Sequence, residues 1–174
     1  MRLLAALALA VLAATLSGCG PGRVTDAPAP EPTVTEEPLF ATDAEALAAA
    51  EKVYREYSDL ADAAGASADP SALTSYVTEE WFAREEAGYR DLAESGKRLV
   101  GTTILTSFRL QSFDGHEIVV YVCHDTRAVR VIEQETLADV TPTDRPNEAL
   151  LEVRFEVEEG LRIAESNLWS NSCS

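Results

Sequence analysis

Basic residues are scarce in this chain of 174 residues: 14 Lys and Arg stand against 30 Asp and Glu, which gives a net charge of −16. No cluster of Lys or Arg interrupts the acidic composition, so the field of the chain repels a phosphate backbone and anionic lipid headgroups. The composition therefore excludes nucleic-acid binding. Any attachment to a membrane has to be covalent or through a partner.

The chain also lacks the short motifs of common catalytic sites, since it contains no GxSxG, Walker A or HExxH pattern. Metal-ligating residue types do occur near one another, but they show no known ligand spacing, and there is no DxDxDG loop. These residues are Asp114, His116, Glu117 and His124. The sequence predicts no metal site and no cofactor.

The N-terminus has the features of an export signal. Met1 and Arg2 precede an apolar run over residues 3–16, which is too short for a stable membrane-spanning helix and has the length of a signal-peptide core. The Leu-Ser-Gly-Cys sequence of residues 16–19 resembles a bacterial lipobox. The resemblance implies that residues 1–18 are removed and that Cys19 carries acyl chains such as palmitate. The alternatives are an ordinary signal peptide and a membrane anchor with an incidental cysteine.

Residues 19–38 differ in composition from the rest of the chain. Five of the residues between positions 20 and 38 are proline, and most others are small, polar or acidic. Such a segment cannot bury enough apolar area to offset its ordering entropy, so we interpret it as a flexible tether. The 2 Trp, 5 Tyr and 5 Phe all lie at Phe40 or later, which places a single domain at residues 39–174.

Helical periodicity follows the tether. Thr42 and Glu45 fit a capping box, and apolar residues recur on one face until Gly65, which predicts a helix of about 20 residues. Asp69 and Pro70 predict a short second helix with Pro70 at its first position. A third helix follows Thr78 and ends at Gly96, with Trp81, Phe82, Tyr89 and Leu92 on its buried side. We interpret the pairs Glu79–Glu80 and Glu85–Glu86 as its solvated face.

After Gly96 the apolar period changes from 3.6 to 2. Asp114-Gly115 predicts a hairpin, residues 118–123 a central strand, and residues 126–132 a further strand. In residues 151–158 the odd positions are apolar and the even ones charged, so the odd set should face the helices and the even set water. Glu159-Gly160 leads into a last strand from Leu161 to about Trp169.

Helices followed by antiparallel strands define an α+β fold. The order and lengths of the elements from Phe40 to Ser174 resemble the nuclear-transport-factor-like fold, in which a curved sheet wraps the helices into a cone with an apolar mouth. A different cystatin-like open sandwich is the alternative. Small envelope lipoproteins of this fold family are common, and other members include cyclases, dehydratases and isomerases.

Two cysteines remain once Cys19 is assigned to lipid. Cys123 lies in a central strand and Cys173 follows the last strand. Disulfides persist in exported proteins, so we predict a Cys123–Cys173 bond. Because no CxxC motif is present, the expected role of the bond is structural and not redox. Two buried free thiols are the alternative.

Candidate acid–base groups are few. His124 and Asp125 are adjacent, so in a regular strand they point to opposite faces and form no dyad without a bulge. Other residues with suitable side chains are Tyr54, Tyr57, Asp62 and Tyr121, and we interpret the tyrosines as core residues and His116 as a solvated turn residue. The sequence predicts no catalytic site, with His124 and Asp125 as the weak candidates.

Together these features predict a protein that is lipid-anchored to the cell membrane on its extracytoplasmic face. The domain is expected to be a non-catalytic module that binds a small apolar ligand or another envelope protein. The alternative is a cyclase-, isomerase- or dehydratase-type enzyme that acts on an apolar ring substrate. A homodimer paired through the sheet is a third hypothesis.

Overall fold

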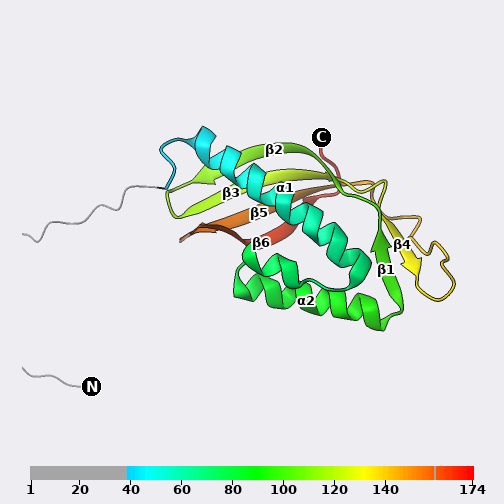
Figure 1. The fold of residues 1–174 in the computed structure, drawn as a ribbon. Coiled ribbons are helices and arrows are strands. Elements are labelled where there is room, and N and C mark those ends of the chain that lie inside the picture. Colours follow the sequence, from blue (N-terminus) through cyan, green and yellow to red (C-terminus); the bar gives the residue numbers. More distant parts are fainter. Residues whose placement is uncertain (1–38, 159) are drawn as a thin grey trace, which may run out of the picture. The chain divides into compact units, whose positions relative to one another are not determined.

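The computed structural model describes residues 39–158 and 160–174, and the first element in this range is α1 (Asp43–Ser67) (Figure 1). The Thr42 hydroxyl oxygen accepts a hydrogen bond from Glu45 N at 3.2 Å, and the Glu45 carboxylate accepts one from Ala41 N at 2.9 Å. The predicted capping residue and the returning Glu45 are therefore confirmed.

The expected end of α1 at Gly65 is wrong. The helix has 25 residues and ends at Ser67, with Ala68 in the left-handed conformation (φ 60°). Gly65 lies inside the helix, where a Cβ atom would come within 3.0 Å of the Leu99 Cβ. Gly65 therefore does not end the helix. Its missing side chain lets Leu99 pack closely against α1.

The second predicted helix is a 3₁₀ turn, η1 (Ser71–Ser75), and Pro70 precedes it instead of forming its first residue. Asp69 Oδ1 accepts a hydrogen bond from Ser71 N at 3.0 Å, so Asp69 still stabilises the start of the turn. The third predicted helix is α2 (Glu79–Glu94), which is capped by Thr78 and ends just before Gly96, as expected.

The strands form two antiparallel sheets. The larger sheet has the order β2-β3-β5-β6, and the smaller one pairs β1 with β4. The Asp114-Gly115 hairpin connects β2 to β3, as predicted. The bounds are β1 (Lys97–Val100), β2 (Ile104–Phe113), β3 (Glu117–Asp125), β4 (Arg130–Glu133), β5 (Glu148–Val157) and β6 (Leu161–Ser170).

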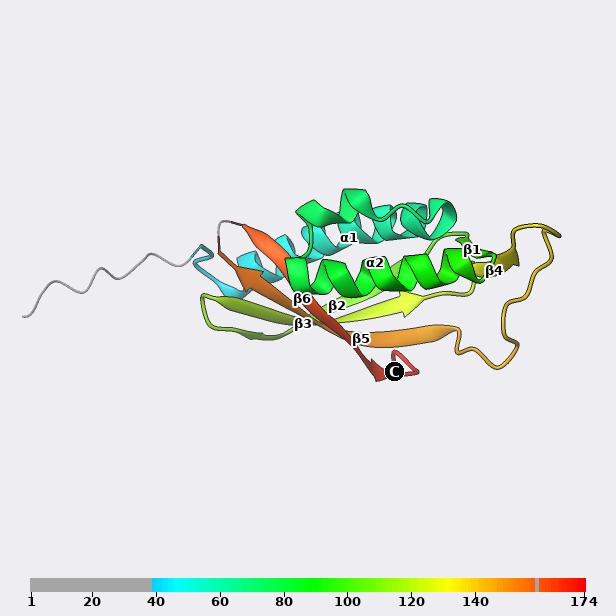
Figure 2. The same ribbon diagram turned by 90° about the horizontal axis from the view of Figure 1, so that it is seen from below.

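Both α-helices cover the same face of the four-stranded sheet, and the β1–β4 pair lies beyond one end of it (Figure 2). Val153 and Phe155 of β5 are fully buried in the core under the helices, and Leu151 and Val157 pack against it. The charged residues between them point to the other face, where Arg154 pairs with Glu117, Glu156 and Glu165. The predicted α+β fold and the alternation in β5 are confirmed.

Candidate functional site

A buried tyrosine lies at the centre of the layer between helices and sheet. Tyr54 of α1 is 1% exposed, and its ring lies 5.5 Å from the ring of Tyr57 and 6.3 Å from that of Phe155. Its hydroxyl shares a hydrogen bond of 3.0 Å with Nε2 of His124 in β3. Burial raises the pKa of Tyr54 above its ordinary value, so the phenol stays protonated.

The two candidate residues of β3 lie on opposite faces of the sheet. His124 points toward α1, and burial lowers the pKa of its imidazole to about 4. Asp125 instead accepts hydrogen bonds from Arg127 Nε at 3.0 Å and Nη2 at 2.5 Å, and this pairing lowers the pKa of Asp125 to about 2. The structure does not bring His124 and Asp125 together.

A second polar cluster surrounds Glu85 of α2. Glu85 Oε1 accepts a hydrogen bond of 2.9 Å from the Trp81 indole nitrogen and another from the Tyr57 hydroxyl. The other carboxylate oxygen, Oε2, is buried and has no hydrogen-bond partner among the residues that the structure describes. Burial raises the pKa of Glu85, although the two donated hydrogen bonds act in the opposite direction.

The interpretation of Glu85 as a solvated residue is therefore wrong. Trp81, Glu85 and Tyr89 follow one another at intervals of four residues, so they share one face of α2. This face points inward: Tyr89 donates a hydrogen bond of 3.2 Å to the Ala61 carbonyl of α1. The helical spacing between two aromatic residues was the signal in the sequence that could have identified Glu85.

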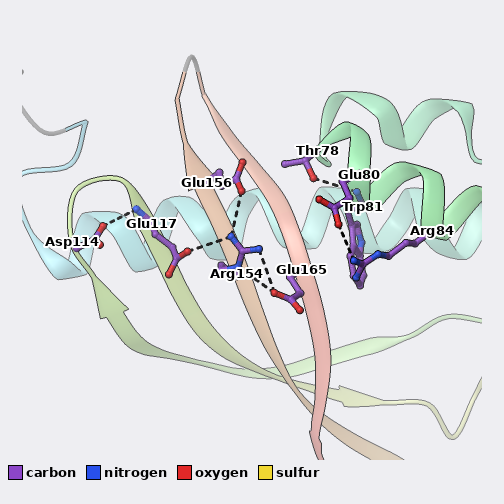
Figure 3. Close-up of polar contacts among 9 residues, drawn as sticks. All are labelled: Thr78, Glu80, Trp81, Arg84, Asp114, Glu117, Arg154, Glu156 and Glu165. Carbon is purple, nitrogen blue, oxygen red and sulfur yellow. Dashed lines mark hydrogen bonds and ion pairs between the residues drawn. The ribbon is translucent and has the colours of Figure 1, made fainter.

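The start of α2 fixes this orientation. The Thr78 hydroxyl oxygen accepts a hydrogen bond from Trp81 N at 3.3 Å, and Arg84 pairs with Glu80 at 2.8 Å, one turn apart on the solvated side (Figure 3). Acidic residues in the first turn also stabilise the positive end of the helix dipole. The Glu80 side chain is 81% exposed, so the prediction that this residue is solvated is confirmed.

A groove of about 360 Å³ lies beside Glu85, between α2 and β1. Its lining residues are Glu85, Gly88, Tyr89, Leu92 and Leu99. A Cβ atom placed on Gly88 would meet no atom within 4 Å, so no packing contact in the described chain explains a glycine in mid-helix. No residue of α2 is fully buried, which leaves part of its apolar face uncovered.

The predicted disulfide is present. Cys123 and Cys173 are bonded, with their Cα atoms 5.6 Å apart, within the range of ordinary disulfides. Cys123 lies on the sheet face opposite the helices, beside Leu150 of the neighbouring strand β5. The bond therefore holds the C-terminal segment against this outer face.

The remaining sequence candidates lie apart from one another. Asp62 accepts hydrogen bonds from the backbone and hydroxyl of Thr103, and Tyr121 contacts Trp169 on the outer face. His116 is exposed in the β2–β3 turn. Within residues 39–158 and 160–174 no three His, Cys, Asp or Glu side chains gather as metal ligands.

The N-terminal predictions fall outside the described residues. This applies to the signal peptide, to the acylation of Cys19 and to the tether. No helix in the described part of the chain is long and apolar enough to cross a membrane.

Comparison with known proteins gives a fold but no family. No family model and no curated protein matches the chain. The crystal structure of the intermembrane space region of the chloroplast protein ARC6 is similar, with a TM-score of 0.50 and 14% identity over 70% of this chain and 95% of that chain. At this identity the likeness shows a shared α+β arrangement. A designed β-sheet protein matches with a TM-score of 0.28 and 17% identity over 71% of this chain and 82% of that chain.

Proposed function

We propose that this chain is a lipid-anchored extracytoplasmic protein whose domain binds a small apolar ligand in the groove between α2 and β1. The observation that carries the proposal is the opening at Gly88, beside Tyr89, Leu92 and Leu99. A glycine in a helix interior costs about 0.5–1 kcal/mol relative to alanine. No described neighbouring atom requires this glycine, and a side chain at this position would project into the open space beside the groove.

The anchoring part of the proposal rests on the sequence. Cys19 follows a short apolar run and three lipobox residues, and the acidic chain has no basic surface that would hold it on anionic lipid. The nuclear-transport-factor-like resemblance supports ligand binding by the domain. Buried side chains such as Tyr54 and Phe155 fill the layer between the helices and the four-stranded sheet, so the proposed ligand site lies at α2 and β1. The Cys123–Cys173 disulfide agrees with export to an oxidising compartment.

Replacement of Cys19 by alanine tests the anchor. In the native host we expect the wild-type protein in the membrane fraction, with an intact mass that shows acyl chains on a polypeptide beginning at Cys19. We expect Cys19→Ala to remain unprocessed at this bond and to lack acyl groups. A Cys19→Ala protein that is still cleaved before position 19 and still membrane-bound would contradict the proposal.

Filling the groove tests ligand binding. Gly88→Leu places a side chain in open space, so we expect the fold to be kept and the binding of the apolar dye N-phenyl-1-naphthylamine to weaken at least about tenfold. Dye fluorescence measures the binding, and thermal unfolding checks the fold. The matched control is Ala83→Leu, which adds the same side chain on the exposed face of α2. Equal dye binding by both variants would place the ligand elsewhere.

The enzyme hypothesis has one supporting observation. The pKa of Glu85 is raised in an apolar setting, and the Tyr57 hydroxyl is bonded to it, which is the type of environment that general acid–base catalysts have. Turnover of a cyclic ketone by the wild type, lost in Glu85→Gln, would favour an isomerase- or cyclase-type function over a binding module.

A further inference from the structure

Oε2 of Glu85 is the starting point for the chemistry of the ligand. In the part of the chain that the structure describes, it is the only buried side-chain nitrogen or oxygen without a hydrogen-bond partner. Glu85 also takes part in no ion pair there, whereas the nearby Glu80 pairs with Arg84. A buried polar atom that lacks a partner destabilises the folded protein, so a ligand that supplies a partner gains affinity.

The other carboxylate oxygen is already occupied. Oε1 accepts hydrogen bonds from Tyr57 and Trp81, which fix the carboxyl group on the inner side of α2. Tyr89 lies one turn further along α2 and lines the groove. Two aromatic side chains therefore hold one oxygen of the carboxyl group, and the ring of a third, Tyr89, lines the groove beside it. The negative face of an aromatic ring attracts an ammonium group.

We infer that the groove binds an amphiphilic amine, whose ammonium group pairs with Glu85 Oε2 and whose apolar part contacts Leu92 and Leu99. This inference rests on the proposed function and specifies its ligand class. The net charge of −16 attracts cations toward the protein and repels carboxylates and phosphates. An ammonium group supplies both the missing hydrogen-bond donor and the missing positive charge.

Ligand entry requires a small movement, because Oε2 is covered in the structure. The side chains of α2 nearest the groove are half-buried and not fully buried, namely Trp81, Glu85, Tyr89 and Leu92. The fully buried residues of the core lie in α1, in η1, at Val77 and in the sheet, and none of them belongs to α2. A ligand can therefore reach Oε2 through a rearrangement of half-buried α2 side chains, without opening a fully buried part of this helix.

Three probes of equal length test the inference: octylamine, octanol and octanoate. Each is titrated against dye-loaded full chain that carries Cys19→Ala, and displacement of N-phenyl-1-naphthylamine measures binding. We expect octylamine to displace the dye at a concentration at least about tenfold lower than octanol, and octanoate to be the weakest. Octanol that is as effective as octylamine would overturn the inference, because Glu85 would then act as a neutral acid or not at all.

Two variants locate the effect at Glu85. Glu85→Gln keeps an oxygen acceptor for Tyr57 and Trp81, and we expect it to reduce the preference for octylamine over octanol to within about threefold. Glu86→Gln removes the same charge from an exposed neighbour and should retain the preference. A preference that persists in Glu85→Gln would assign it to the acidic surface and overturn the inference.

Binding of the dye and the three probes by the wild type distinguishes failure of the proposed function from failure of this inference alone. If the wild type binds neither the dye nor any of the three probes, the groove is not a ligand site and the proposed function fails with the inference. If the wild type binds the dye and octanol but does not favour octylamine, the proposed function stands and only the amine is wrong. The comparison of probes on the wild type decides this even if a variant does not fold.

Discussion

Removal of the disulfide through Cys173→Ser is expected to lower the free energy of unfolding by about 4 kcal/mol. The bond joins residues 50 positions apart, and the loss of loop-closure entropy in the unfolded chain gives this magnitude. Such a loss is a large fraction of the 5–15 kcal/mol that stabilises a typical domain. Urea unfolding of oxidised wild type and of Cys173→Ser measures the difference.

Cys173 is the better position to replace. It is half-buried near the chain end, whereas Cys123 is 2% exposed and its replacement would add a packing cost. The wild type in reductant is the matched control, because it breaks the same bond without a substitution, and its unfolding midpoint should fall to that of the variant. Oxidised wild type and variant that unfold within about 1 kcal/mol of each other would contradict the prediction.

The strand pattern of β5 could be predicted because a half-buried strand has a strict period of two. Val153 and Phe155 enter the core, and Arg154 between them faces outward, as the sequence indicates. The same alternation separates His124 from Asp125. In contrast, the hydrogen bond between His124 and Tyr54 joins residues 70 positions apart, and nothing in the local sequence of either residue predicts it.

The β1–β4 sheet shows where local patterns fail. β1 has four residues, which is too short to display a period, and its partner lies about thirty residues later in the chain. Gly101 has φ 102°, and a Cβ atom there would lie 2.1 Å from the Ala128 carbonyl oxygen, so the chain after β1 depends on a contact with a distant loop. Only the tertiary structure reveals the reason for this glycine.

The polar cluster around Glu85 was missed for a different reason. Adjacent glutamates favour the interpretation of a solvated helix face, and that interpretation holds for Glu80 and Glu86. Glu85 departs from it because it occupies the same helical face as Trp81 and Tyr89. A carboxylate on the inward, aromatic face of a helix is unfavourable because burial disfavours its charge. Residues that break the usual rules of burial in this way are expected at functional or strained sites.

Acid is expected to destabilise the domain through His124. Burial lowers the pKa of its imidazole in the folded protein to about 4, whereas the unfolded value is 6.5. Protonation therefore favours the unfolded chain. The contribution of His124 is fully present above pH 6.5 and is lost as the pH falls toward 4, by roughly 3 kcal/mol at the low end.

The slope of stability against pH isolates this effect. We expect the free energy of unfolding of wild type to fall between pH 7 and pH 4 by roughly 3 kcal/mol more than that of His124→Gln. The variant also loses the hydrogen bond to Tyr54, which changes its stability at every pH but not this slope.

His116→Asn is the control, since it removes the exposed histidine of the β2–β3 turn and should keep the wild-type slope. Asp125 does not affect the comparison, because its carboxyl titrates in wild type and in His124→Gln alike and its contribution cancels in the difference. Equal slopes in wild type and His124→Gln would show that His124 is solvated and does not belong to the buried layer.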